Sequence, residues 1–390
     1  MAEPAKRSLC TDCGISRTSK PNRCGKACQF INPDYPKHEK LAHGRSRDEL
    51  KNPDELIFGP FRKIHRASLI DPKPGAQWTG IATEIGRRLL EEGKVDAVLA
   101  VKPDPEDRWK PKPVVVTNPE EMRQCRGMRM GFSPTLALLE PAIEAGLRRI
   151  ALIGIPCQVY ALRALEKELG LEKLFIIGTP CSDNTTTENF HIFLDLLTDK
   201  PESVTYLEFR ADYQVELRFD DGKTREIPFL KLPISKLPGD FFSLTCQTCV
   251  DYTNSLSDIT VGYMGGSGEQ WLIVRNSRGE ELLELLNGAI RLSEPSSSGN
   301  RKAHVSGFLK NIERSVTGLP LRRMPGFVRP IVAWLMPKIG PKGMEFARTR
   351  VEMKAVESVL QLQKHFPAKA KNMIPDHVWK MAKSYGLQRE

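Results

Sequence analysis

Eight of the nine cysteines in this chain fall into two groups of four, and four thiols are the number that one zinc ion or one 4Fe–4S cluster binds. The first group is Cys10, Cys13, Cys24 and Cys28, and the second group is Cys157, Cys181, Cys246 and Cys249. Cys125 has no partner in spacing, and we expect it to be structural. The N-terminal residues contain no apolar signal core, and clustered cysteines without one indicate metal or redox chemistry more often than disulfides.

The two groups differ in the metal that they favour. Two closely spaced pairs, as in the first group, are typical of a zinc ribbon and of an iron–sulfur site alike. In the second group, Cys157 and Cys181 each end an Ile-Gly-x-Pro-Cys phrase, and Cys246 and Cys249 form a Cys-x-x-Cys motif. The alternative interpretation of Cys157 and Cys181 is a pair of buried small hydrophobes. The repeated phrase favours a redox centre inside a larger domain.

Both Pro-Cys turns follow a predicted strand. The apolar runs at 149–154 and 173–178 flank a helical pattern at 157–170, so the segment predicts a βαβ unit with parallel strands. Parallel neighbours end at the same edge of a sheet, and ligands of α/β proteins bind at that edge. We therefore expect Cys157 and Cys181 to meet there.

The remaining pattern predicts an α/β fold of mixed α+β character, in which a partly parallel sheet with βαβ units is joined by antiparallel strands. Helices are expected at 79–92, 133–146 and 279–290, and further strands at 95–101, 113–117, 203–210, 213–229, 257–263 and 270–276. The stretch 213–229 contains an Asp-Gly pair at 221–222, which predicts a hairpin turn. We divide the chain into a cysteine-rich N-terminal segment that is irregular without a metal (1–70), a domain with the glycine-containing loop (71–155), a domain with the second cysteine group (156–318) and a basic helical tail (319–390).

The net charge of +10 is concentrated at one end of the chain. Residues 321–390 contain 14 Lys and Arg against 5 Asp and Glu. We expect a solvated helical tail; the alternatives are a surface for an acidic protein or an anionic membrane. Nucleic acid is disfavoured, because no aromatic-interleaved basic groove or DNA-reading motif is present. No apolar run reaches the roughly 18 residues of a membrane span, and the apolar stretch 325–341 is expected to pack in the core, which predicts a cytoplasmic protein.

The motifs GAQWTGIATEI, GIPCQVYALRALEKELGLEKLFIIGTPCSDN and CQTCVDYTNSLSDITVGYMGG resemble the beta subunits of deazaflavin-coenzyme hydrogenases and dehydrogenases. The N-terminal CTDCG, AHGRSR (42–47), FSPTL (132–136) and IGPKGMEFAR (339–348) are similar to the ferredoxin-dependent branch of that family. This branch contains the 3,8-divinyl (proto)chlorophyllide 8-vinyl reductases and the 7-hydroxymethyl chlorophyll a reductases. The resemblance spans nearly the full length.

The resemblance implies FAD, two 4Fe–4S clusters, ferredoxin as electron donor and a chlorophyllide-type tetrapyrrole as substrate, with reduction of the 8-vinyl group to ethyl. It implies that residues 1–70 are an iron–sulfur segment, that residues 71–155 are the flavin-binding domain and that residues 156–318 contain the second iron–sulfur site, so it favours iron–sulfur over zinc for the first cysteine group. Many relatives have a third cysteine where this chain has Ser16, so we expect Cys24 to take its place as a ligand; the alternatives are Ser16 itself as the ligand or an incomplete cluster. The family context also extends the expected location to the periphery of a photosynthetic membrane.

The resemblance further implies a flavin site and a reacting site. The first flavin candidates are Gly75, Gln77, Trp78, Thr79, Gly80, Ser133 and Thr135. Asn254 and the run 262–266 are secondary candidates. By itself, the glycine loop before the helix is as typical of a tight turn as of a phosphate site. His43 is the candidate proton donor and Arg45 the candidate partner of a substrate carboxylate; the alternative for His43 is a solvated loop histidine.

Three alternatives stay open at this point. The same scaffold supports 7-hydroxymethyl chlorophyll a reduction or a deazaflavin-linked oxidoreduction. A zinc-stabilised binding protein without catalysis is the alternative from another class. A homo-oligomer is compatible with each.

Overall fold

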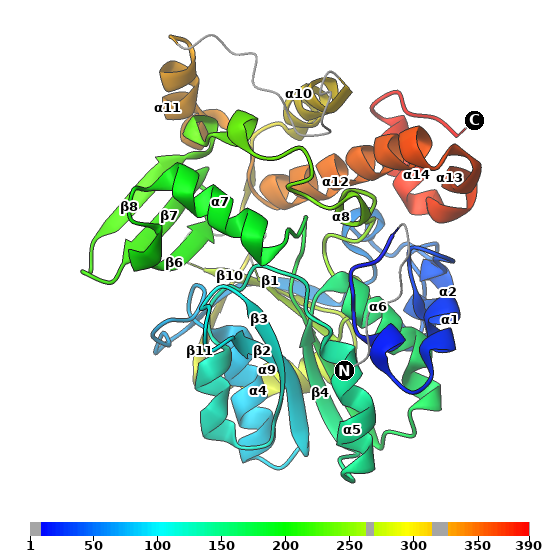
Figure 1. Cartoon of the computed structure of the whole chain (residues 1–390). Helices are drawn as coiled ribbons and strands as arrows, with labels where there is room; N and C mark the ends of the chain where they lie inside the picture. The colour runs from blue at the N-terminus through cyan, green and yellow to red at the C-terminus, as the bar shows by residue number, and fades with distance from the viewer. Residues whose placement is uncertain (1–8, 263–268, 314–326, 390) are drawn as a thin grey trace.

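The computed structural model describes residues 9–262, 269–313 and 327–389, and its centre is an eight-stranded mixed sheet (Figure 1). From edge to edge its strands are β11 (Ile290–Ser293), β1 (Lys63–Leu69), β10 (Gln270–Val274), β9 (Ile259–Gly262), β5 (Lys173–Gly178), β4 (Arg149–Gly154), β2 (Ala97–Pro103) and β3 (Pro111–Val116). Strands β2, β4, β5 and β9 are parallel, and the outer strands pair antiparallel to them or to one another. The predicted α/β class is confirmed, and β4 and β5 have the bounds that the apolar runs predicted.

Helices cover both faces of this sheet. On one face, α4 (Ile81–Glu91) and α9 (Ser277–Glu284) pack on residues such as Ala151, Phe175 and Ile177. On the other face, α5 (Leu139–Glu144) and α6 (Pro156–Leu165) pack on Ile150, Leu152 and Ile176. The alternation of neighbouring residues between the two cores follows from the period of two in a strand. Burial on both faces explains why the strands of the βαβ unit are almost continuously apolar.

A second, antiparallel sheet consists of β6 (Val204–Phe209), β7 (Gln214–Phe219) and β8 (Thr224–Pro228), and α7 (Thr187–Leu197) covers it. The predicted hairpin turn at Asp221–Gly222 is present, with Gly222 at φ 81°. Figure 1 shows this sheet lying apart from the main sheet, on the side where the parallel strands end.

The N-terminal segment is more regular than its composition predicted. It contains α1 (Cys24–Ala27), α2 (Tyr35–His43), α3 (Glu55–Phe58) and β1, and β1 is the second strand of the main sheet. The expectation of an irregular segment up to residue 70 was therefore wrong. Strand β1 is extended because it pairs with β10 and β11, which are distant in the sequence. The mixed polar and apolar residues of β1 do not by themselves predict a strand.

The C-terminal helices are α10 (Arg301–Glu313), α11 (Arg329–Ile339), α12 (Met344–His365), α13 (Pro367–Met373) and α14 (Asp376–Lys383). The short strands β12 (Ser297–Ser298) and β13 (Lys342–Gly343) pair beside them, and α8 (Leu244–Gln247) lies below α12. The prediction of a solvated tail was wrong for helix α12, because its residues Val356, Val359 and Leu362 are completely buried. The prediction that the apolar stretch 325–341 packs in the core was also wrong in part, because α11 exposes Ile331, Trp334 and Ile339. None of the helices in the described ranges combines the length and apolar content needed to cross a bilayer.

Candidate functional site

The two Pro-Cys turns lie side by side at the end of β4 and β5. Gly154 and Gly178 are in register, and the backbone N–H of Thr179 donates to the Gly154 carbonyl at 2.9 Å. A β-carbon at Gly178 would lie 2.7 Å from the side chain of Asn254, so only glycine allows this close approach. The βαβ geometry thus brings the residues that precede Cys157 and Cys181 together, as the sequence predicted.

Asn254 holds both turns in place. Its Nδ2 donates to the carbonyl of Gly154 at 2.8 Å and to that of Thr179 at 3.3 Å, and the residue is completely buried at φ 57°. Its Oδ1 is buried and has no hydrogen-bond partner among the described atoms. The sequence predicts a cofactor contact for Asn254, whereas its observed contacts favour positioning the cysteine turns.

All four thiols of the second group line one cavity. Cys157 and Cys181 reach the cavity from the two Pro-Cys turns. Cys246 reaches it from α8, and Cys249 from the loop that follows α8. The hydroxyl of Ser243 caps α8 by accepting from the Cys246 N–H at 3.2 Å, and the Cys181 N–H donates to the Tyr252 carbonyl at 3.0 Å. Four sulfur donors around one cavity are a suitable donor set for an iron–sulfur cluster.

Burial holds these thiols in the neutral form. It raises the pKa of Cys157 and of Cys181 well above the ordinary value of a thiol, and neighbouring cysteines raise both further. Burial also raises the pKa of Cys249 to about 12, although the nearby Lys354 ammonium lowers it. A metal centre binds thiolates, so loading this site must release protons.

Lys354 was not anticipated as part of this site. Its Nζ lies 2.6 Å from Asp183 Oδ1 and 2.9 Å from Glu357 Oε2. Burial works to lower the pKa of Lys354, but these two carboxylates raise it above its usual value, so the ammonium stays charged. A buried cation beside Cys249 and Cys181 would offset the negative charge of thiolate ligands. Lys354 lies in the C-terminal tail, and nothing in the local pattern there indicates this contact.

The first cysteine group is also gathered. Burial raises the pKa of Cys13 to about 12, and the neighbouring Cys24, Cys28 and Cys10 raise it further. The Cys13 carbonyl accepts from the Leu136 N–H at 3.0 Å, which fixes the N-terminal segment against the 3-10 helix Thr135–Leu138. Thr11, which lies between Cys10 and Cys13, lines the cavity of the second group together with Cys157, so the segment with the first group reaches that cavity.

Cys24 stays the predicted fourth ligand of the first group, with Ser16 as the alternative. We expect Cys24→Ala to remove the first cluster and to reduce bound iron to about half, because a 4Fe–4S cluster needs four ligands. Ser16→Ala is the matched control and should keep the full iron content. Iron analysis and the electron paramagnetic resonance of the reduced protein would check this. Loss of iron in Ser16→Ala but not in Cys24→Ala would assign the ligand to Ser16 instead.

No three of the His, Cys, Asp and Glu side chains in the described ranges are arranged to hold one metal ion. The choice between zinc and an iron–sulfur cluster for these thiols stays a prediction.

The predicted flavin loop joins β1 to α4 in an unusual conformation. Gly75, Trp78 and Gly80 all have positive φ, and Trp78 at 53° is strained for a residue with a side chain. The Thr79 hydroxyl accepts from the Leu69 N–H at 3.1 Å, and the Gln77 Nε2 donates to the Leu207 carbonyl at 3.1 Å. The loop is thus fixed between the main sheet and β6, and its flavin role stays a prediction.

The other flavin candidates lie in a different environment. Gln158 Nε2 donates to the Ser133 carbonyl at 3.0 Å and to the Thr135 hydroxyl at 3.1 Å. These residues belong to the layer that holds Cys13 and α6, whereas Gln77 contacts β6. Of the run 262–266, residues 263–266 lie outside the described residues.

His43 and Arg45 are engaged inside the protein. His43 Nε2 donates to the Ser255 carbonyl at 2.8 Å, and its Nδ1 accepts from Asn276 Nδ2 at 3.2 Å. Burial and the nearby Arg275 lower the pKa of His43 well below its usual value. Arg45 forms a two-pronged ion pair with Glu55. These contacts favour structural roles for both residues.

A second unanticipated pair lies beside the flavin loop. The Tyr206 hydroxyl donates to Glu208 Oε2 and contacts the backbone of Trp78. Glu208 Oε1 is buried without a hydrogen-bond partner in the described part of the chain. Burial raises the pKa of Glu208 to about 7, so this carboxyl holds a proton at nearly neutral pH.

The raised pKa of Glu208 has a consequence for stability. The folded state binds this proton more tightly than the unfolded state, so the carboxyl destabilises the fold as the pH rises from 4.5 to about 7. We expect Glu208→Gln to raise the free energy of unfolding by about 1–3 kcal/mol at pH 8 and to change it little near pH 4. Denaturant titrations at both pH values would measure this. The exposed Glu226→Gln on β8 is the control; an equal effect there would contradict the assignment.

Comparisons with known proteins agree with the motifs. The family model "Coenzyme F420 hydrogenase/dehydrogenase, beta subunit N-term" matches residues 64–140, and the model for the C-terminal part of the same beta subunit matches residues 147–298. The chain is 38% identical to the uncharacterized protein all1601 of Nostoc sp., over 98% of this chain and 95% of that protein. It is 37% identical to the chloroplastic 7-hydroxymethyl chlorophyll a reductase of Oryza sativa, over 98% of this chain and 83% of that protein.

A solved structure supports the fold. A chain of the F420-reducing [NiFe] hydrogenase complex from Methanosarcina barkeri superposes with a TM-score of 0.58. The superposition covers 81% of this chain and 96% of the hydrogenase chain, and the two sequences are 20% identical.

Proposed function

The chain belongs to the coenzyme F420 hydrogenase/dehydrogenase beta-subunit family, and from this premise we propose a ferredoxin-dependent reductase that converts the 8-vinyl group of a divinyl chlorophyllide-type pigment to ethyl. It is an oxidoreductase on the scaffold of that family. One observation carries the proposal: Cys157, Cys181, Cys246 and Cys249 surround one cavity at the rim of the parallel strands.

The cofactors in this proposal are two 4Fe–4S clusters and FAD, which supply one-electron transfer and two-electron hydride chemistry respectively when they are bound. The cysteines of each group would hold one cluster. The loop from Gly75 to Gly80, with Ser133 and Thr135, would hold the flavin. Reduction of a vinyl group takes two electrons and two protons, whereas ferredoxin delivers one electron at a time, so the enzyme needs both kinds of carrier.

Two features of the chain support this division of work. Thr11, which lies between Cys10 and Cys13, lines the cavity of the second group, so the segment with the first group reaches the second, as electron transfer between two clusters would require. The net charge of +10 favours association with an acidic electron donor such as a ferredoxin.

A second candidate reaction is reduction of the 7-hydroxymethyl group of chlorophyll a. The 37% identity to the rice enzyme of that name, over nearly the whole chain, favours it specifically. Both reactions take two electrons and two protons, so the cysteine sites do not distinguish them.

The decisive experiment is an anaerobic assay with chemically reduced ferredoxin and each pigment separately. We expect divinyl chlorophyllide to gain two hydrogens, as measured by mass spectrometry of the separated pigments. Turnover of 7-hydroxymethyl chlorophyll a alone would replace the proposed reaction with the second candidate. A colourless protein with stoichiometric zinc would contradict both and favour the binding protein.

A further inference from the structure

Helix α11 and the turn before it expose large apolar side chains in the part of the chain that the structure describes. Phe327 is 80% exposed, Ile331 57%, Trp334 63% and Ile339 66%. Ile331 and Trp334 are three residues apart on α11, which places them on one side of the helix, and Phe327 lies in the turn just before it. Large apolar side chains concentrated on one surface indicate a contact with another apolar phase.

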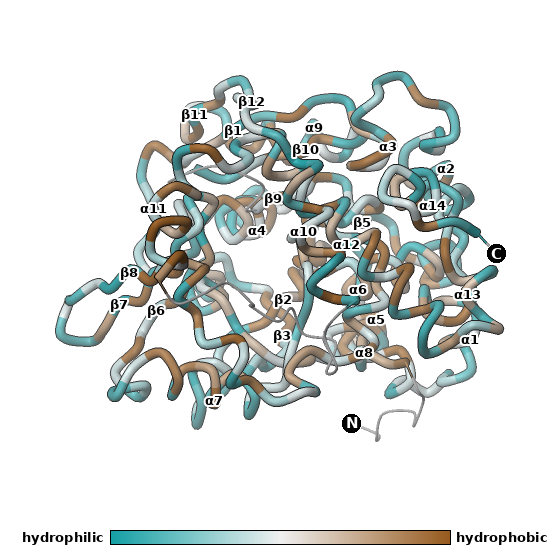
Figure 2. Tube along the Cα trace, turned by 90° about the horizontal axis from the view of Figure 1, so that it is seen from above, coloured by the Kyte–Doolittle hydropathy of each residue, from teal (hydrophilic) through white to brown (hydrophobic). Residues whose placement is uncertain are grey.

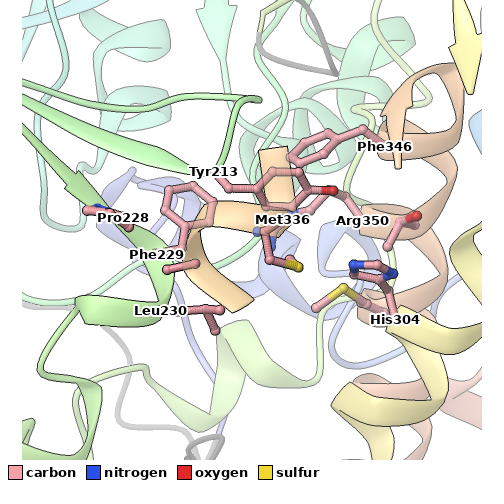
Figure 3. A pocket seen from close by; sticks show the side chains of 11 residues that line it. Tyr213, Pro228, Phe229, Leu230, His304, Met336, Phe346 and Arg350 are labelled. Atoms are coloured by element: carbon pink, nitrogen blue, oxygen red, sulfur yellow. The ribbon is translucent and has the colours of Figure 1, made fainter. Parts of the chain in front are cut away.

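The opposite face of α11 is anchored. Ala333 and Met336 close an apolar cavity of about 170 Å³ together with Tyr213, Phe229 and Phe346, and Figure 3 shows Met336 next to these rings. The Tyr213 hydroxyl donates to the Pro341 carbonyl at 2.8 Å and so fixes the turn after the helix. Figures 1 and 2 both place α11 beside the β6–β8 sheet at the margin of the molecule. The helix is therefore held by one face, and its exposed face points away from the core.

The charge of this helix and of the turn after it has one sign. Lys338 and Lys342 are exposed, and the described residues 327–344 contain no Asp or Glu. The Nζ of Lys338 lies 3.3 Å from the centre of the Trp334 ring, so cation and aromatic ring share the surface. Lys, Trp and aliphatic side chains on one short helix are typical of a segment that lies in a membrane interface.

We propose that α11 and Phe327 dock the protein on an anionic lipid bilayer, with Phe327, Ile331 and Trp334 inserted at the level of the headgroups and the positive charge of the segment attracted to anionic lipids. The helix has 11 residues and is about 16 Å long, which is too short to span the roughly 30 Å apolar core of a bilayer. Contact in the plane of the interface uses the apolar face and the positive charge together. An acidic protein partner would use the charge but leave the three apolar side chains without a matched environment. This inference does not depend on the reaction that the enzyme catalyses.

Vesicle binding of the full-length protein tests the proposal. Co-sedimentation would be measured with vesicles of phosphatidylcholine alone and with a three-to-one mixture of phosphatidylcholine and phosphatidylglycerol. We expect at least roughly tenfold tighter binding to the mixture, weakened by salt. The double variant Ile331→Asp/Trp334→Asp should lose that binding by roughly tenfold or more, because it places two carboxylates at the interface.

The matched control is Leu41→Asp/Leu50→Asp, which makes the same charge change at two other exposed apolar residues, 47% and 48% exposed. It should bind vesicles as the parent protein does, and circular dichroism should show that both variants are folded. Equal binding by the α11 variant and the control, or no preference for the anionic vesicles, would overturn the proposal. So would a dimer in light scattering that the α11 variant abolishes while vesicles are not bound, since the surface would then be an interface between two copies.

Discussion

Replacing Cys181 with alanine is expected to lower ferredoxin-dependent turnover by more than about 100-fold and to reduce bound iron to about half. Cys181 is one of the four thiols around the cavity at the sheet rim. Its backbone N–H donates to the Tyr252 carbonyl, and the nearby Lys354 ammonium works to lower its pKa. Three remaining cysteines cannot supply a fourth sulfur to the cluster. Iron content, the visible spectrum and turnover of the same preparation measure the effect.

Cys125→Ala is the control for this experiment. Cys125 is partly buried against the core that contains Met122 and Ile85, and it does not line the cavity of the second group. The variant should keep its iron and its turnover. If Cys181→Ala retained full iron content and turnover, the second cysteine group would not hold a cluster, and the proposed function would lose its main support.

Replacing Asp258 with alanine is expected to lower the free energy of unfolding by about 3–5 kcal/mol. Asp258 is completely buried, and its Oδ1 accepts from Arg163 at 2.7 Å and from Asn276 at 2.8 Å. Its Oδ2 accepts from the Ile176 backbone N–H at 2.7 Å. The alanine variant would leave the buried guanidinium of Arg163 without this carboxylate, which is the costly case for an ion pair.

Denaturant titration of the variant and of Asp221→Ala would separate this effect from a general loss of charge. Asp221 pairs with Lys223 at the exposed hairpin, where solvent screens the ion pair and its contribution to stability is small. A loss below about 1 kcal/mol in Asp258→Ala would show that the Arg163–Asp258 contact is not a main connection between α6 and the segment before β9.

Local patterns determined the parts of the fold in which neighbouring residues decide the conformation. The apolar runs ending in Gly154 and Gly178 predicted β4 and β5 with their observed bounds. The right-handed crossover of a βαβ unit then predicted that Cys157 and Cys181 share one edge of the sheet. The hairpin at Gly222 followed from turn chemistry in the same way.

Contacts between distant segments were decided only by the tertiary structure. Strand β1 forms because it pairs with β10 and β11, more than 200 residues away. Lys354 reaches Asp183 across 171 positions, and Asn254 reaches Gly154 across 100 positions. The sequence marked His43 as a candidate acid, whereas burial between the Ser255 carbonyl and Asn276 makes it a structural contact.

The physical reason for this division is the range over which each signal acts. Hydrophobic periodicity, turn residues and cysteine spacing are written within a few tens of residues, so the cysteine turns and the class of chemistry were accessible from the sequence. The surroundings of each thiol, the burial that sets each pKa and the exposed face of α11 depend on which distant segments pack together. That packing is a property of the whole chain, because the free energy of each contact depends on residues that are distant in the sequence and that the local sequence does not identify.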